Sequence, residues 1–161
     1  MNASAFSRIY DPEKDSAAEA AAQNDNSWFS PFVGGSVGVL LPNAGLSTGA
    51  RFGHFRNYYN AGFTAFYDFM INKDAYGVTF DSYFLRGTQA GTRLDWMLSI
   101  GMGKIVDSDH KSVDAAVFNV GTIGQITQSV SVYFRLYNYI PIESGGKYTI
   151  GLDILGLRVS F

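Results

Sequence analysis

The sequence has no cysteine and only two histidines, His54 and His110, among its 161 residues. Disulfide frameworks, thiolate metal sites and cysteine nucleophiles are therefore excluded, and little remains for a histidine-based metal centre. Charged residues are also scarce, because they make up 16% of the chain against an average of about 25%. The net charge is −2 and no run of Lys or Arg occurs, which argues against nucleic acid as a partner. We expect neither a cofactor nor a bound metal.

Long apolar runs are missing as well, since no stretch reaches the ~18 consecutive apolar residues that a transmembrane helix requires. The chain is nevertheless rich in apolar material: 47% of the residues are hydrophobic and 16% are aromatic. That content is too high for a disordered protein. The apolar residues must therefore be buried or covered in some form other than a spanning helix.

Glycine is absent from the first part of the chain, because all 18 glycines lie at or after Gly34. Residues 1–26 carry two basic and five acidic side chains together with many alanines, whereas the remainder carries ten basic and nine acidic ones. Asp11-Pro12-Glu13 is a favourable helix start, but a helix this short is marginal alone in water. We expect an acidic, Ala-rich tail or short helix over residues 1–26 and a separate body over residues 27–161.

The body alternates apolar and small or polar residues with a period of two, which indicates β-strands. Turn residues such as Pro42, Asn43 and Gly45 separate the segments. Eight segments can be drawn: 28–41, 46–55, 59–69, 76–84, 93–103, 112–123, 130–137 and 148–161. The eighth changes phase near Ile154 and Leu155.

The sixth segment has no clear phase. Two sets of residues compete for its apolar face: Val113, Ala115 and Val117 on one phase, and Ala116, Phe118 and Val120 on the other. An extra residue in one strand would let both sets face the same side. A β-bulge there would reconcile the two sets, and the sequence leaves the phase of this segment open.

The weaker face of these strands carries small residues and a recurring set of opposite charges. Its charged members are Arg51, Asp68, Asp81, Arg93, Asp95, Arg135 and Arg158. This composition is typical of the narrow interior of a small closed barrel, where scarce water makes each charge need a partner. We expect the four arginines to pair with the three aspartates in a polar network inside the lumen.

The aromatic face would then point outward. A continuous apolar surface of that breadth exceeds what soluble monomers tolerate, and it suits lipid. Strands of about ten residues match the apolar band of an outer membrane. Candidates for the interfacial aromatic girdles are Trp28, Phe29, Phe32, Phe55, Tyr58, Tyr59 and Trp96. The sequence therefore predicts an all-β, eight-stranded antiparallel up-and-down transmembrane barrel.

The last six residues, Gly156-Leu157-Arg158-Val159-Ser160-Phe161, resemble the terminal strand of bacterial outer-membrane β-barrels. With eight strands and a charged interior, residues 27–161 resemble the smallest of these proteins, the OmpX and OmpA membrane-domain type. The resemblance implies contact with outer-membrane lipid and lipopolysaccharide, and both termini in the periplasm. It also implies insertion by the barrel assembly machinery, with Leu157, Val159 and Phe161 as the assembly signal. The acidic segment 1–26 departs from this pattern and leaves room for a periplasmic or membrane protein partner.

Three functions fit the sequence. The first is a non-enzymatic barrel with a structural or interaction role, as a membrane anchor, assembly subunit or adhesion-type barrel, and not an open pore. The second is a lipid-modifying enzyme on the same scaffold, since His110-Lys111-Ser112 resembles the His-x-Ser pair of lipid A deacylase barrels. The third is a soluble lipocalin-like binder with its aromatic face turned inward. We expect the first, and we interpret His110 and Ser112 as loop residues rather than catalytic ones.

Overall fold

The computed structural model describes residues 28–39, 43–53, 57–89, 92–127, 129–143 and 147–161. The acidic segment 1–26, His54 and Phe55 lie outside these residues. Eight strands occupy the described part: β1 (Phe29–Gly38), β2 (Asn43–Phe52), β3 (Tyr59–Met70), β4 (Lys73–Gln89), β5 (Thr92–Asp107), β6 (Ser112–Gln125), β7 (Val130–Pro141) and β8 (Thr149–Ser160). Within the described ranges, no helix has the length and apolarity needed to cross a membrane.

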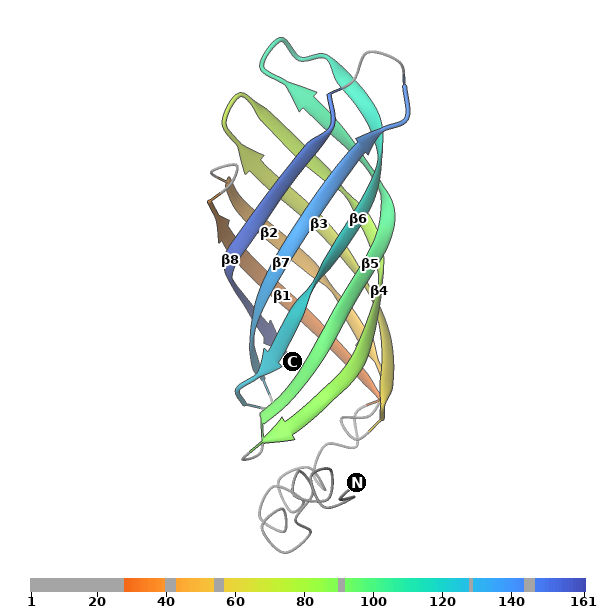
Figure 1. Cartoon of the computed structure of the whole chain (residues 1–161), viewed down its shortest axis with the longest axis vertical. Helices are drawn as coiled ribbons and strands as arrows, with labels where there is room; N and C mark the ends of the chain where they lie inside the picture. Colours follow the sequence, from red (N-terminus) through yellow and green to blue (C-terminus); the bar gives the residue numbers. More distant parts are fainter. Residues whose placement is uncertain (1–27, 40–42, 54–56, 90–91, 128, 144–146) are drawn as a thin grey trace, which may run out of the picture.

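Each strand pairs antiparallel with the next along the chain, and β8 pairs back onto β1 to close the barrel (Figure 1). At the seam, Phe32 faces Ser160 and Val37 faces Leu155. The predicted eight-stranded antiparallel barrel is confirmed. The start of β1 and the end of β8 lie at one end, which we call the terminal end. The connections β1–β2, β3–β4, β5–β6 and β7–β8 lie at the other, the loop end.

Burial follows the alternation expected from the sequence, and β3 shows it most clearly. Asn60, Thr64 and Asp68 point into the barrel and are buried, whereas Phe63 and Phe69 point outward and are about half exposed. Side chains on one strand alternate between the two faces of the sheet. In a closed sheet this alternation separates an interior set from an exterior set.

The sixth segment, whose phase the sequence left open, folds as β6 without a bulge. Strand β6 keeps one register with both β5 and β7, so Ala115 and Val117 face inward while Phe118 and Val120 face outward. The interior near the loop end is itself apolar, because Ala115 and Val117 join a buried cluster with Phe66, Ile105 and Tyr137, among others. Both competing sets of apolar residues are therefore accommodated, one on each face.

Two other strands do carry an extra residue. In β8 the register with β1 and with β7 shifts around Ile154, and Ile154 and Leu155 are both exposed, which confirms the phase change expected there. In β4 the register with β5 shifts between Leu85 and Gly87. The fourth segment, drawn from the sequence to residue 84, continues as strand to Gln89. A bulge bends the strand and redirects its side chains.

Glycines let neighbouring backbones approach closely in this narrow barrel, and β6 offers a matched pair for testing the effect. A Cβ added at Gly121 would lie against the carbonyl oxygen of Phe134 and the Cα of Arg135, whereas at Gly124 it would meet only side-chain atoms of Leu94 and Val132, at 3.8 and 3.9 Å. We expect Gly121→Ala to lower the free energy of unfolding by about 1–3 kcal/mol, as at overpacked sites. Gly124→Ala should stay within about 0.5 kcal/mol of the wild type. Urea unfolding in micelles measures both, and equal effects would contradict the close approach.

Candidate functional site

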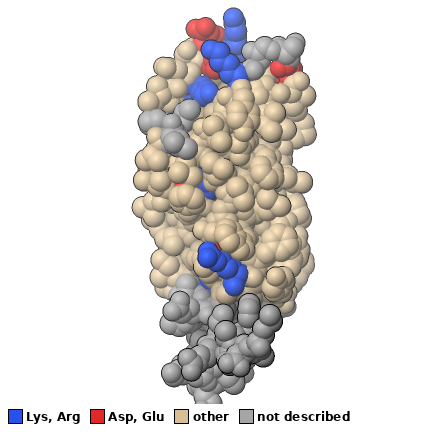
Figure 2. All heavy atoms as spheres, viewed as in Figure 1, with Lys and Arg blue, Asp and Glu red and all other residues tan. Residues whose placement is uncertain are grey.

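On the face drawn in Figure 2, uncharged residues cover most of the described barrel wall between its two ends. Large hydrophobic side chains with at least two fifths of their surface exposed occur on all eight strands, among them Val33, Leu46, Phe63, Val78, Ile100, Phe118, Phe134 and Leu157. A patch of this extent is not tolerated on a soluble monomer. Lipid provides a favourable environment for it, and the closed ladder leaves no strand edge unpaired, as a bilayer requires.

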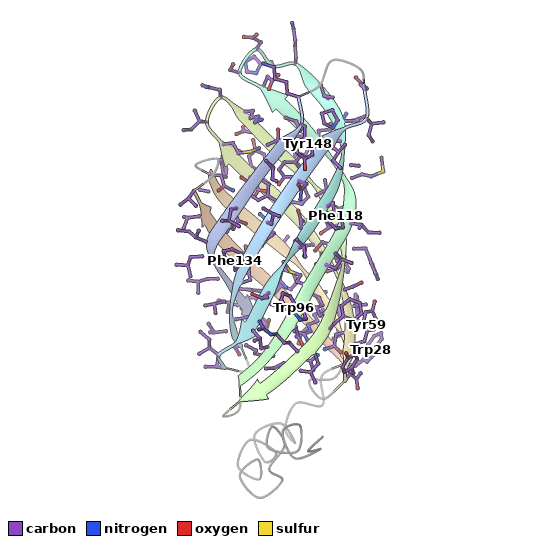
Figure 3. All side chains as sticks on the ribbon, in the orientation of Figure 1. Trp28, Tyr59, Trp96, Phe118, Phe134 and Tyr148 are labelled. Carbon is purple, nitrogen blue, oxygen red and sulfur yellow. The ribbon has the colours of Figure 1, made fainter. Side chains whose placement is uncertain are left out.

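Aromatic side chains gather at the terminal end of this wall. Trp28, Tyr59 and Trp96 lie there, Tyr148 lies near the loop end, and Phe118 and Phe134 lie between (Figure 3). The rings of Trp28 and Phe52 are 5.5 Å apart. Tryptophan and tyrosine favour the membrane–water boundary because their rings are amphipathic. The terminal end therefore carries one aromatic girdle.

One expected girdle residue is placed differently. Phe32 points into the barrel and is 2% exposed, with the Arg158 guanidinium carbon 3.7 Å from its ring centroid. Glycine at position 49 on β2 makes room for the ring, because a Cβ there would lie 2.9 Å from Phe32 Cζ. The girdle assignment of Phe32 is therefore wrong.

Charges at the outer surface concentrate at the loop end (Figure 2). Lys104 and Asp114 form an ion pair there at 2.6 Å, and both side chains are nearly half exposed. Lys111 and Glu143 are also exposed in this region. Exposed pairs of this kind contribute little to stability, so these residues are available for contacts with other molecules.

The interior holds a charged cluster in which one arginine joins two carboxylates. Arg135 Nε donates to Asp153 Oδ2 at 2.7 Å, and Arg135 Nη2 donates to Asp68 Oδ2 at 3.2 Å. The Tyr139 hydroxyl also donates to Asp68, and Asn43 Nδ2 donates to Asp153 Oδ1 at 3.1 Å. Asp68 and Asp153 are almost fully buried. This cluster ties together strands β2, β3, β7 and β8.

A second interior cluster lies nearer the terminal end and joins one carboxylate to two arginines. Arg51 Nη2 lies 2.7 Å from Asp95 Oδ2, and Arg93 Nε donates to Asp95 Oδ1 at 2.8 Å. Arg93 is fully buried. The guanidinium of Arg51 also lies over the ring of Tyr83, 4.7 Å from its centroid.

Arg158 and Asp81 do not take part in the direct arginine–aspartate ion pairs expected from the sequence. Asp81 accepts hydrogen bonds from three hydroxyl groups, those of Thr64, Thr79 and Tyr83. Arg158 Nη1 donates to the Tyr83 hydroxyl at 2.8 Å, so Tyr83 stands between the two charges. Among the described residues, neither Arg158 nor Asp81 forms an ion pair.

Sequence reasoning missed Asp153, Tyr83 and Tyr139 as members of the network. Asp153 lies directly before the bulge in β8, so the alternation counted back from the C-terminus puts it on the wrong face. A separate count on each side of the phase change, with Thr149 and Gly151 on the inner face, would have found it. Tyr83 shares the phase of Asp81 and Tyr139 that of Arg135, so alternation places both tyrosines on the inner face but does not predict their hydrogen bonds.

The lumen is filled by these side chains. Between the two charged clusters lies a cavity of about 10 Å³, lined by Ser47, Asp81, Asn119 and Arg158, among others. That space is enough for one water molecule. Tyr83, Met97, Ile123 and Tyr133 form a second buried apolar cluster. A barrel of eight strands has an interior just wide enough for its side chains, and the packing here has that character.

The two catalytic candidates lie at the loop end. His110 adopts a positive φ of 60° in the β5–β6 connection, and His110 and Ser112 are both exposed. The backbone N–H of His110 donates to the Asp107 carbonyl at 2.8 Å, as in a tight turn. The structure has no hydrogen bond between the two side chains. The described residues also contain no group of three or more His, Asp or Glu placed to hold a metal ion.

The three residues of the expected assembly signal share the outer face of the last strand. Leu157 and Val159 are 49% and 40% exposed on β8, and Phe161 follows the strand with 75% exposed. The backbone N–H of Phe161 donates to the Pro31 carbonyl at 3.0 Å. The C-terminal ring therefore contributes little buried surface to the folded barrel.

Removing Arg135 tests the buried network. Arg135→Met leaves Asp68 and Asp153 buried without their shared cation, so we expect the free energy of unfolding to fall by about 3 kcal/mol or more. Adding Asp153→Asn to Arg135→Met should recover part of the loss. Lys104→Met, which breaks the exposed pair with Asp114, is the matched control and should leave the unfolding midpoint unchanged. Denaturant titration in micelles measures all three; a near-neutral Arg135→Met would show that these charges are hydrated.

Comparisons with known proteins find similarity only to solved structures. No family model matches the sequence, and no curated protein matches it either. The chain is similar to a structure described as de novo design of transmembrane beta-barrels, with 8% identity, a TM-score of 0.47, and coverage of 83% of this chain and 94% of that one. It is also similar to Ail, the attachment invasion locus protein of Yersinia pestis, with 12% identity, a TM-score of 0.46, and coverage of 83% and 95%. Its closed ladder and apolar wall make the chain a small eight-stranded transmembrane β-barrel.

Proposed function

We propose that this chain is a non-enzymatic barrel of the bacterial outer membrane with a structural or interaction role. The observation that carries the proposal is the distribution of polarity: apolar side chains cover the wall, and buried ion pairs fill the lumen. Such barrels belong to outer membranes. The terminal end faces the periplasm and the exposed charges of the loop end face outward, where lipopolysaccharide and surface partners are found.

Binding at the surface, rather than transport, fits the filled interior. Arg135 reaches Asp68 and Asp95 reaches Arg51 across the lumen, and the cavity between their clusters holds no more than one water molecule. The role we propose is that of a membrane anchor, an assembly subunit or an adhesion-type barrel. Residues 1–26 would provide a contact for a periplasmic or membrane protein partner.

The enzymatic alternative receives less support from the geometry. A serine nucleophile needs a base within hydrogen-bond reach and a third group to orient that base. His110 lies exposed in the β5–β6 turn and Ser112 exposed at the start of β6, and their side chains share no hydrogen bond. Release of fatty acid from lipid A that is lost in Ser112→Ala or His110→Ala would identify a lipid-modifying enzyme instead.

The soluble lipocalin-like alternative would need the opposite orientation of the two faces. A lipocalin-type barrel encloses its ligand in an interior cavity. Here the interior carries buried ion pairs and no ligand-sized space at the level of Asp81 and Asn119, and aromatic rings such as Phe63 and Phe80 point outward. This arrangement favours lipid outside over ligand inside.

Folding in lipid tests the membrane assignment. The purified chain should reach its folded state only in detergent or lipid vesicles, because its wall cannot be hydrated. Unboiled samples should migrate differently from boiled ones in gel electrophoresis, since a closed ladder has no free edge from which to unravel. A sample kept in urea without lipid is the control. A folded, monodisperse monomer in aqueous buffer would contradict the proposal.

Deleting Phe161 tests the expected assembly signal. Because the ring is 75% exposed in the barrel, its loss should change the unfolding free energy of refolded barrel by no more than about 0.5 kcal/mol. Insertion into outer membranes in cells should fall severalfold, whereas Phe161→Tyr, which keeps an aromatic end, should insert normally. Equal losses of stability and of insertion would remove the reason for invoking a signal.

A further inference from the structure

One cation stands apart from the charges of the loop end. Arg86 is exposed on β4, near the terminal end, beside Trp96 of the aromatic girdle. Figure 2 shows atoms of Lys or Arg on the lower third of the wall, surrounded by uncharged atoms. A charged side chain on a lipid-facing wall is costly unless it reaches the boundary with water. At that boundary the guanidinium of Arg86 can meet water or an anionic partner.

Arg86 is the extra residue of the bulge in β4. Leu85 pairs with Asp95 and Gly87 pairs with Leu94. Asp95 lies inside the barrel, so its partner Leu85 is on the inner face as well. Arg86, the next residue, has no pairing partner on β5. Bulges commonly redirect a side chain at a functional position.

The contacts of Arg86 orient its guanidinium without neutralising it. Its Cζ lies 4.8 Å from the centroid of the Trp96 ring, and that ring is 48% exposed. No ion pair joins Arg86 to a carboxylate in the part of the chain that the structure describes. Next to it, a Cβ added at Gly87 would meet nothing within 4 Å, so the wall beside the guanidinium is open.

We propose that Arg86, stacked on Trp96 and flanked by the open position at Gly87, binds the phosphodiester of a phospholipid in the leaflet at the terminal end. Guanidinium groups bind phosphate with paired hydrogen bonds, and tryptophan marks the depth at which headgroups lie. The contact with the Trp96 ring holds the guanidinium beside the girdle, and no ion pair among the described residues occupies its N–H groups. The inference deepens the proposed function, because it rests on the barrel spanning a membrane.

Lipid retention by the folded barrel tests the site. The full chain, folded in detergent micelles, is titrated with phosphatidylglycerol, and bound lipid is counted by native mass spectrometry. We expect Arg86→Ala to weaken retention of one lipid about tenfold, the size expected when a hydrogen bond to a charged group is lost. Lys111→Ala removes one positive charge at the opposite end and is the matched control, with unchanged retention. Arg86→Lys should fall between, since it keeps the charge and loses the planar contact.

A second measurement reports on the site itself. The chain has two tryptophans, Trp28 and Trp96, so Trp28→Phe leaves Trp96 as the sole indole fluorophore. Phospholipid carrying a nitroxide on its headgroup should quench this emission severalfold more strongly when Arg86 is present than in the same background with Arg86→Ala.

The outcomes separate the possibilities. Retention that is equal in Arg86→Ala and wild type, or lost equally in Lys111→Ala, overturns the site. Displacement of the lipid by millimolar inorganic phosphate overturns the assignment to a phospholipid and leaves a free anion site. All variants should keep the unboiled gel mobility of the folded barrel. A wild-type chain without that mobility shift refutes the proposed membrane function, a result distinct from failure of the headgroup site.

Discussion

Backbone hydrogen bonding in the absence of water is the constraint on which this structure depends. In hydrocarbon, each unpaired N–H or C=O costs several kcal/mol, so a spanning sheet must have no edge. The seam between β1 and β8 meets that requirement. Strand β1 contributes small residues there, including Gly34 and Ser36, and a Cβ at Gly34 would lie only 2.7 Å from the Leu157 carbonyl oxygen. Closure of the barrel therefore depends on residues with small side chains, which let the two backbones approach.

A closed wall of eight strands leaves an interior that must be filled, and here charged side chains share it with hydroxyl groups and two apolar clusters. Buried charges raise the cost of folding unless they are paired and hydrogen-bonded. Arg135 satisfies two carboxylates on β3 and β8, and Asp95 satisfies two arginines on β2 and β5. Each cluster links strands that are not neighbours in the sheet. The network thereby constrains the cross-section of the barrel, which backbone pairing alone leaves open.

Much of this arrangement could be predicted from the sequence, because period-two alternation reports directly which face a residue occupies. The positions of Arg51, Asp68 and Arg135 followed from that rule. Inference from residue type failed where the interior is not polar: Val117 and Phe32 face inward, Val117 in an apolar cluster and Phe32 against the Arg158 guanidinium. The partner of a charge depends on strand stagger around the barrel, which alternation does not encode.

The clearest limit of alternation is the bulge in β8, and it also shows how the wall and the network are coupled. Asp153 and Arg158 are five residues apart, so an unbroken strand would place them on opposite faces. The extra residue at Ile154 resets the phase. Asp153 can then bind Arg135 while Arg158 reaches Tyr83. Both Ile154 and Leu155 face outward, where lipid accepts two consecutive apolar side chains. The β4 bulge differs, because regular alternation from Tyr83 already places Arg86 on the outer face and the extra residue changes the phase only beyond it. The β8 bulge thus lets one strand serve the buried network on both sides of its phase change while its outer face stays apolar.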